Sequence, residues 1–196
     1  MVTEYLRVLK DKLGDSRYTH SLCVADSARE LAARYGAERE NAYTAGLLHD
    51  ILKDASGVEQ LCALKKSGII LTPSETANPK LWHAPAGAAY LEHELGITDE
   101  DILNAVRYHT TGRAGMSLLE KVIYIADYVS ADRTYNGADT MRILAAQSLE
   151  AAMLFALEFG IGHLAKTKQV IHTNSVECYN ELIIRQREKE REGGVL

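Results

Sequence analysis

The stretch AGLLHDILKD, residues 45–54, places His49 and Asp50 directly after a run of apolar residues. Apolar side chains recur with the spacing of one helix face across residues 38–53. A polar pair at the end of such a run is partly withdrawn from water, and burial of polar groups costs free energy unless they find partners. The pair therefore marks a place where other polar groups must converge.

Helical spacing of apolar residues recurs along nearly the whole chain, and no segment shows the strict alternation of a strand. VIYIADYV, residues 122–129, has the composition of a strand, but it lies inside a longer helical pattern and is interpreted as a buried helix. Gly36 is a suitable stop for the helix before it. The predicted helices cover residues 3–13, 16–35, 38–53, 58–67, 83–95, 99–109, 117–130 and 139–168, with a last one from about Ser175.

These segments predict a single all-α domain over residues 1–196, with roughly eight to ten helices. The chain ends in the charged tail RQREKEREGGVL, residues 185–196, whose end is expected to fray.

Composition excludes several classes of protein. A net charge of −5 offers no general attraction to a phosphate backbone, which argues against a protein that binds nucleic-acid duplexes. Cys23, Cys62 and Cys178 form no CxxC pair, so we expect reduced thiols. The N-terminus lacks the pattern of a signal peptide, and no apolar run approaches the ~20 residues that cross a bilayer. We therefore expect a cytoplasmic protein without membrane contact.

Other histidines and an aspartate also lie in helical segments. They are His20 in RYTHSLCVA, His83 in WHAPAGA, His109 in NAVRYHTTG and Asp127 in VIYIADYV. Each histidine alone is more often a core or surface residue than a ligand, and for Asp127 a core salt bridge fits as well as a metal. Together with the His49-Asp50 pair they make six candidate ligands on five predicted helices, which a bundle can aim at one point. Imidazoles and carboxylates without thiolates suit iron, manganese or zinc.

The order H…HD…H…H…D in this sequence resembles the HD-domain superfamily of metal-dependent phosphohydrolases. The strings AGLLHDILK, LWHAPAGA and AVRYHTTGRAGMSLLEKVIYIADYVSADR further resemble the YqeK-type bacterial proteins, from about Arg17 to Asn180. The resemblance implies a single HD-domain helical bundle with its core at about residues 17–180. It also implies symmetrical hydrolysis of diadenosine tetraphosphate to two ADP, through attack of a metal-activated hydroxide on phosphorus. The implied cofactor is one or two divalent transition-metal ions, iron in the first place and manganese in the second.

By this resemblance His20, His49, Asp50 and Asp127 hold a first metal, and Asp50 bridges to a second. His83 and His109 complete the second metal site, or contact phosphate oxygens if only one ion binds. Asp50, Lys53 and Asp127 are the implied catalytic residues.

Several further residues are candidates for binding the substrate. Lys53 lies one turn after His49 and suits a phosphate, although a solvated surface lysine is nearly as good an interpretation. Arg133 follows the helix of Asp127 and can reach back to phosphates; Arg113 is a weaker candidate. Thr110 and Thr111 offer hydroxyls beside His109, or cap a turn. His172, Thr173, Asn174 and Ser175 are expected to line the nucleotide pocket, although Thr173, Asn174 or Ser175 can instead be a helix N-cap.

Other functions remain open at this point. An HD phosphohydrolase for mononucleotides or cyclic nucleotides uses the same scaffold, and so does a nucleotide- or metal-sensing module without turnover. A di-iron oxygenase fits less well, because Lys53 and Arg133 suit a phosphate. His93 and His163 are interpreted as structural or exposed, and Cys23 is given no role. The resemblance makes a homodimer plausible.

Overall fold

A computed structural model of the chain describes residues 2–193. Within this range the backbone forms eleven α-helices and one 3₁₀ helix, and no strand, as the sequence predicts. The 122–129 segment is confirmed as a helix with most of its side chains buried. The elements are α1 (Val2–Lys12), α2 (Asp15–Tyr35), α3 (Arg39–Leu48), α4 (Gly57–Lys66), α5 (Pro73–Ala77), η1 (Pro79–Leu81), α6 (His83–Leu95), α7 (Glu100–Tyr108), α8 (Leu118–Val129), α9 (Ala138–Gln147), α10 (Leu149–Lys166) and α11 (Thr173–Gly193).

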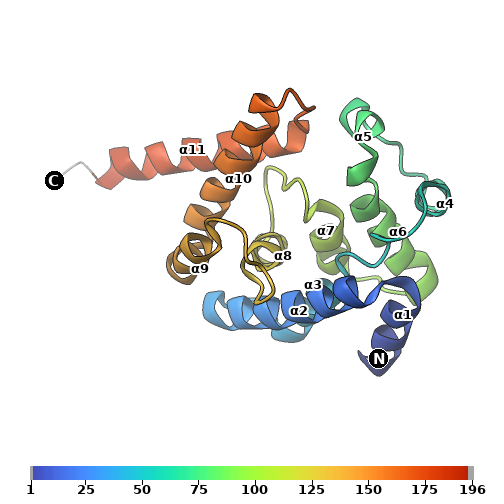
Figure 1. The fold of residues 1–196 in the computed structure, drawn as a ribbon. Helices are drawn as coiled ribbons and strands as arrows, with labels where there is room; N and C mark the ends of the chain where they lie inside the picture. Colours follow the sequence, from blue (N-terminus) through green and yellow to red (C-terminus); the bar gives the residue numbers. More distant parts are fainter. Residues whose placement is uncertain (1, 194–196) are drawn as a thin grey trace.

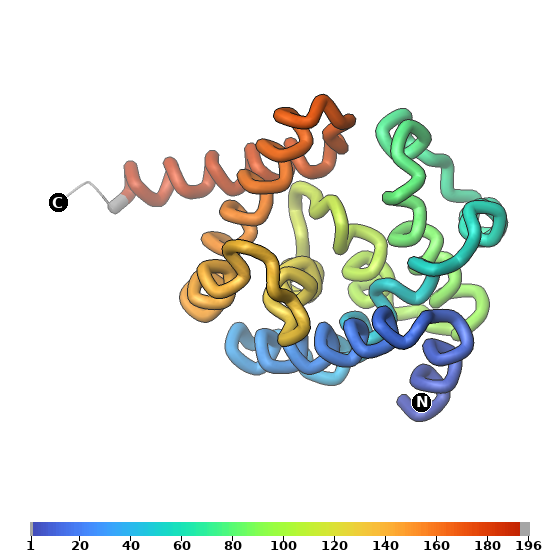
Figure 2. Tube along the Cα trace, viewed as in Figure 1, coloured from blue at the N-terminus to red at the C-terminus, as the bar shows by residue number. Residues whose placement is uncertain are grey.

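Helices α2, α3 and α8 form the centre of the bundle. Figures 1 and 2 show α9, α10 and α11 on one side of α8, and α4, α5 and α6 on the other, with α11 extending outward. The buried apolar side chains form one continuous cluster that runs from Tyr5 in α1 to Leu182 in α11. Burial of this cluster supplies the main driving force for folding.

The backbones of α2 and α3 approach each other closely at Gly46 in α3. A methyl group added there would meet the Cα of Ala25 at 3.0 Å and the backbone oxygen of Val24 at 3.1 Å, both in α2. Only glycine leaves room for the two helices at this distance. The contact sets the position of the end of α3, where His49 and Asp50 follow.

Helix α3 is shorter than the sequence predicts. The prediction of a continuous helix over residues 38–53 is wrong after Leu48, because residues 49–54 form tight turns. The amide of Ile51 bonds the carbonyl of Leu48 at 3.1 Å, and that of Lys53 bonds the carbonyl of Asp50 at 2.8 Å. These i to i+3 bonds are those of a 3₁₀ conformation, which often ends an α-helix.

The predicted helix over 139–168 is also divided. Ser148 has an extended backbone, with φ −158° and ψ 126°, and its side chain caps the start of α10 by accepting a bond from the amide of Ala151. Serine is a favoured N-cap because its hydroxyl competes for such amides. The single break separates α9 from α10.

Two short elements were not predicted. Pro73 starts α5, which has a capping box between Thr72 and Glu75, and Pro79 starts η1. Proline is tolerated in the first turn of a helix, so these residues begin short helices here.

The last helix begins at Thr173 and continues through most of the charged tail to Gly193. The remainder of the predicted frayed end, residues 194–196, lies outside the described range. Among residues 2–193, no helix is both long and apolar enough to cross a membrane.

The close contact at Gly46 generates a prediction about stability. Gly46→Ala should lower the free energy of unfolding by about 1–3 kcal/mol, because the added methyl group overpacks the α2–α3 contact. Gly162→Ala, inside α10 with nothing within 4 Å of the added methyl group, is the matched control. It should raise the free energy of unfolding by about 0.5–1 kcal/mol. Urea unfolding of both variants measures the difference; equal effects of the two substitutions would contradict the close packing.

Candidate metal centre

Four histidines converge in the middle of the bundle, and each has a hydrogen bond that fixes its ring. His49, His83 and His109 are each bonded through Nδ1 to the backbone oxygen three residues earlier, at 2.6, 2.8 and 2.7 Å. His20 is bonded through Nδ1 to Oδ2 of Asp132 at 2.8 Å. Because a carbonyl or carboxylate oxygen can only accept, Nδ1 is the donor in every case. The lone pair of a neutral ring therefore lies on Nε2.

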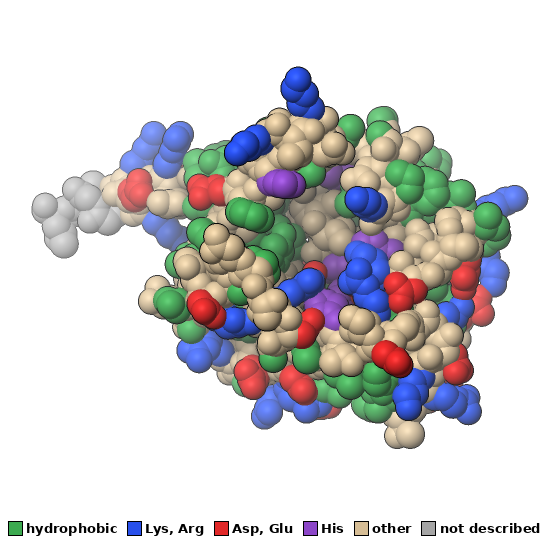
Figure 3. All heavy atoms as spheres, in the orientation of Figure 1, with side chains coloured by type: hydrophobic (Ala, Val, Ile, Leu, Met, Phe, Trp, Pro, Cys, Tyr) green, Lys and Arg blue, Asp and Glu red, His purple; other side chains and the backbone are tan. Residues whose placement is uncertain are grey.

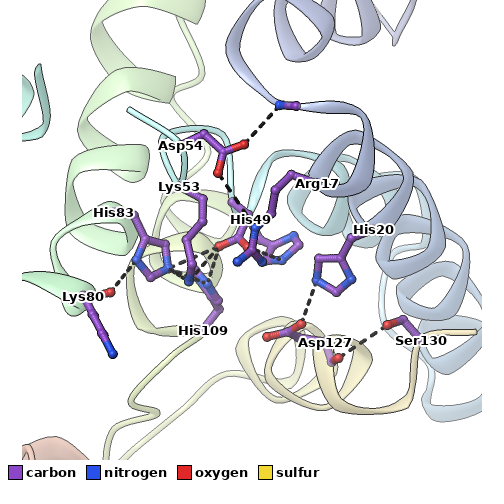
Figure 4. A network of polar contacts seen from close by, with 12 residues as sticks. Arg17, His20, His49, Lys53, Asp54, Lys80, His83, His109, Asp127 and Ser130 are labelled. Carbon is purple, nitrogen blue, oxygen red and sulfur yellow. Dashed lines mark hydrogen bonds and ion pairs between the residues drawn. The ribbon is translucent and has the colours of Figure 1, made fainter. Parts of the chain in front are cut away.

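The Nε2 atoms of His49, His83 and His109 lie near the carboxylate of Asp50, and Figure 4 shows the rings of these three histidines gathered at one place. Oδ1 of Asp50 lies 3.2 Å from Nε2 of His83 and 3.4 Å from Nε2 of His109. Oδ2 lies 3.7 Å from Nε2 of His49. Bonding of Nδ1 to a protein acceptor, with Nε2 left free, is the usual arrangement of metal-binding histidines.

Two groups of potential ligand atoms share Asp50. One consists of His20, His49 and Asp50, the other of Asp50, His83 and His109, and within each group the ligand atoms lie within 4.8 Å of one another. All five residues are buried. A carboxylate has two oxygens, so Asp50 can bind two ions at once.

Asp127 lies beside the first group. Its Oδ1 is 3.0 Å from Nε2 of His20. The structure thus brings together all six residues that the sequence singles out as candidate ligands.

Two buried atoms at the centre have no hydrogen-bond partner. They are Nε2 of His49 and Oδ1 of Asp50. Unpartnered buried polar atoms are rare in folded proteins, because each has lost its hydration without compensation. These two atoms lie among inward-facing imidazoles and carboxylates. Such a group of ligand atoms suits divalent cations.

The pKa shifts agree with this use. Burial lowers the pKa of His49 and of His83 to about 4, so both rings are neutral at neutral pH. Burial acts to raise the pKa of Asp50 and of Asp127, but the neighbouring imidazoles, which are protonated at the low pH where these carboxyls titrate, and Arg133 beside Asp127 outweigh it and hold both pKa values well below the usual range. Neutral imidazoles and ionised carboxylates are the forms that bind metals.

His20 differs from the other three histidines. Burial acts to lower its pKa, but the hydrogen bonds to Asp127 and Asp132 outweigh burial and raise it. A protonated His20 would donate from Nε2 to Oδ1 of Asp127, 3.0 Å away.

Lys53 points into the centre, which contradicts the interpretation as a solvated surface lysine. Its Nζ lies 3.0 Å from Nε2 of His83 and 3.6 Å from Oδ1 of Asp50. The tight turn after Leu48 produces this contact, because residues i and i+3 eclipse in a 3₁₀ conformation. The sequence predicted that Lys53 reaches the site because it lies one α-helical turn after His49. In the structure it reaches the site through the 3₁₀ turns instead.

Two arginines also reach the buried carboxylates, and together with Lys53 they form what we call the cationic rim. The side chain of Arg133 returns to the end of α8 as predicted: Nε donates to the backbone oxygen of Asp127 at 2.8 Å, and Nη2 pairs with the Asp127 carboxylate. Arg17, which the sequence did not single out, places Nη1 3.4 Å from Oδ2 of Asp50. Figure 3 shows basic side chains around a hollow in which histidine is visible.

Arg17 and Asp132 are the residues at the centre that sequence reasoning missed. Arg17 lies three residues before His20 on α2, so a search for basic residues one turn from a ligand could have found it. Asp132 has no local signal, because it bonds a residue 112 positions away in the chain.

A cavity of about 140 Å³ is lined by Tyr108 and Thr110, which flank His109 in the chain, and is named the cavity next to His109. Its lining also includes Thr72, Thr111, His172 and Asn174. The predicted substrate residues at the start of α11 therefore divide into two kinds. His172 and Asn174 line the cavity, whereas Thr173 is exposed and does not.

The cap of α11 is not the one expected. Nδ1 of His172 accepts a bond from the amide of Asn174 at 3.1 Å, so His172 starts the helix in place of Thr173, Asn174 or Ser175. The hydroxyl of Ser175 instead donates to the backbone oxygen of Thr111 at 2.8 Å.

The remaining candidates have structural contacts. Arg113 donates to both carboxylate oxygens of the buried Glu120, at 2.7 and 2.6 Å. His163 stacks on Phe159, and His93 is partly exposed beside Glu92, in keeping with the structural or exposed roles expected of both.

Comparison with known proteins identifies a matching family and similar enzymes. The model of the HD domain family matches residues 17–132, more than half of the chain. The symmetrical bis(5'-nucleosyl)-tetraphosphatase of Bacillus subtilis is 40% identical over 182 residues, which cover 92% of this chain and 96% of the relative. The enzyme of the same name from Halalkalibacterium halodurans is 38% identical over 186 residues, 93% of this chain and 97% of the relative.

A solved structure is similar throughout. The crystal structure of a protein from Clostridium acetobutylicum, described as a predicted HD superfamily hydrolase involved in NAD metabolism, superposes with a TM-score of 0.91 at 38% identity. The match covers 94% of this chain and 98% of that one. The likeness extends over the whole helical arrangement around the centre.

Proposed function

The chain belongs to the HD domain family, and from that premise we propose that it is a metal-dependent hydrolase that cleaves diadenosine tetraphosphate and water to two ADP. The observation that carries the proposal is the pair of buried ligand groups that share Asp50, in a chain 40% identical to a symmetrical bis(5'-nucleosyl)-tetraphosphatase. In this reaction water oxygen forms a bond to one of the two inner phosphorus atoms, and the central anhydride bond breaks to release the second ADP.

The residues at the centre would hold two divalent ions. His20, His49, Asp50 and Asp127 would hold the first, and Asp50, His83 and His109 the second. Iron is our first choice and manganese our second, because imidazole and carboxylate ligands suit both. When bound, such ions lower the pKa of water and offset negative charge on phosphoryl oxygens.

The cationic rim would bind the polyphosphate. Lys53, Arg133 and Arg17 already face the carboxylates of the centre, at hydrogen-bond or ion-pair distance. These cations are free to turn to phosphate oxygens once metal ions neutralise the carboxylates. Arginine presents paired donors that match phosphate oxygens, and lysine supplies a mobile point charge.

The cavity next to His109 would receive a nucleoside. Thr110, His172 and Asn174 line it with polar groups that can bond a ribose or a base. Because Tyr108 and Thr110, which flank His109 in the chain, line this cavity, a nucleoside bound there would lie near the proposed metal centre.

The reaction itself provides the first test. Protein loaded with Mn²⁺ or Fe²⁺ should convert diadenosine tetraphosphate to ADP as the sole nucleotide product, as measured by ion-exchange chromatography at short times. AMP with ATP in equal amounts would contradict symmetrical cleavage. Turnover of mononucleotides or cyclic nucleotides only, or tight binding of ADP without any hydrolysis, would favour another HD phosphohydrolase or a sensor.

Two substitutions separate the metal ligands from the cationic rim. Asp50→Ala should abolish metal content and activity together, because both ligand groups lose their shared carboxylate. Lys53→Ala should keep the metal and raise KM about 10–100-fold, the value of one charge-assisted bond to phosphate. Lys66→Ala, which removes an exposed lysine paired with Glu94, is the charge-matched control.

Metal analysis of freshly purified protein and steady-state kinetics provide both measurements. Normal metal content in Asp50→Ala would overturn the assignment of the centre. An unchanged KM in Lys53→Ala would remove that lysine from the substrate site.

We also propose that the protein is a cytoplasmic homodimer. Its three cysteines are free thiols, which suits a reducing compartment. Phe159 is exposed on α10, one turn after Phe155, and Phe155 and Leu182 line a groove of about 440 Å³ between α10 and α11. A second copy that covers this groove would bury Phe159.

Light scattering after gel filtration tests the dimer. The wild type should have twice the 21.6 kDa mass of one chain, and Phe159→Glu should shift it toward a single chain. Val58→Glu, at an exposed apolar residue in α4, should leave the dimer intact. A mass of 21.6 kDa for the wild type would contradict the proposal.

A further inference from the structure

The segment between α8 and α9, residues 130–137, carries two side chains that reach the centre. Asp132 bonds Nδ1 of His20, and Arg133 pairs with Asp127. Yet the segment itself is largely exposed and irregular. Its backbone has few bonds of its own: the amide of Arg133 bonds Ser130 at 3.0 Å, and that of Ala138 bonds Tyr135 at 3.0 Å. A contact from outside the segment must therefore hold Asp132 and Arg133 in position beside His20 and Asp127.

Arg142, one turn into α9, makes that contact. Its Nε donates to the backbone oxygen of Val129 at 3.1 Å, and its Nη2 donates to those of Ser130 and Arg133 at 3.0 and 2.6 Å. Its Nη1 bonds Asp139 at 2.8 Å. The guanidinium thus ties the last residue of α8 and its C-cap to the backbone of Arg133.

The chemistry of these acceptors explains why an arginine is needed. The last carbonyls of a helix have no partner within the helix and carry partial negative charge, so a cation there is favourable. Three carbonyls in different directions require a planar group with several fixed donors. Lysine has the charge but not this geometry.

We propose that Arg142 is a positioning residue of the metal centre, which holds the 130–133 backbone so that Asp132 orients His20 and Arg133 faces Asp127. Arg142 touches neither a candidate ligand nor the cavity next to His109, and it acts only through the backbone of this segment. The proposal rests on the proposed metal centre, since it assigns a residue that keeps one of its ligands oriented. Loss of a group that orients a ligand typically costs about 10–100-fold in metal affinity.

The chain offers a matched control at the other end of α9. Arg34 donates to the backbone oxygen of Ala146 at 3.1 Å, so it also ties a helix end through a carbonyl, but it is not connected to the centre. Arg34→Ala therefore removes a bond of the same kind without affecting residues 130–133.

The experiment measures the segment and the metal separately. In metal-free protein, Arg142→Ala and Arg142→Lys should speed hydrogen exchange about tenfold or more in peptides covering 129–137 and leave α2–α3 peptides unchanged. Mn²⁺ affinity, followed by the electron paramagnetic resonance signal of the free ion, should fall about 10–100-fold in both variants. Arg34→Ala should stay within about twofold of the wild type in both measurements.

Two further results distinguish positioning from general stabilisation. Added ethylguanidinium should restore part of the Mn²⁺ affinity of Arg142→Ala. The double variant Asp132→Ala/Arg142→Ala should bind Mn²⁺ no more weakly than Asp132→Ala, because only the bond of Asp132 to His20 orients a ligand, whereas Arg133 is a cation and offers no ligand atom. Additive losses, or wild-type exchange and affinity in Arg142→Ala, would overturn the proposal. If the wild type bound no Mn²⁺, the proposed function would fail on its own, and exchange in metal-free protein would still decide whether Arg142 holds the segment.

Discussion

The structure depends on one buried carboxylate, that of Asp50, surrounded by imidazoles whose orientation is fixed. An ionised carboxylate in a protein interior is costly unless cations or donors surround it. The Nδ1 atoms of His49, His83 and His109 donate to backbone oxygens. In the neutral rings, the Nε2 atoms that face Asp50 therefore carry lone pairs and no proton. The arrangement is unfavourable for the protein alone and favourable once cations enter. The packed helices hold the imidazoles in place, and a bound cation would offset the negative charge of Asp50.

The end of α3 at Leu48 affects the same carboxylate. The 3₁₀ turns after Leu48 place residues that are three apart on the same side of the chain, and so bring Lys53 next to Asp50. The prediction of a helix over 38–53 failed here because apolar periodicity records which face is buried and does not record where the backbone tightens.

The candidate ligands could be predicted from sequence because they are polar residues in helical segments with buried apolar neighbours. This signal is local, and it identified His20, His83 and Asp127 as well as the His49-Asp50 pair. Asp132 and Arg142 have no such signal. Asp132 lies in an irregular segment, and Arg142 binds the backbone of that segment. The bond of Asp132 to His20 spans 112 positions, so only the packing of the helices shows what these two residues contact. The break at Ser148 was missed for a related reason, since one capping serine interrupts an otherwise helical pattern.

The cations of the rim offset the charge of the buried carboxylates and also suit an anionic substrate. Arg133 and Lys53 lie against Asp127, Asp50 and His83 as internal counterions, which lowers the cost of burying two carboxylates. Divalent ions at the same carboxylates would make these side chains redundant as counterions, and their charges would then become available to an anion that arrives from the hollow. Lys53 has a flexible stem and can change partner by rotation alone, whereas Arg133 remains anchored through Nε to the backbone of Asp127. Metal and substrate binding would therefore be linked through the same two cations, which divalent ions at the carboxylates would leave available to phosphates.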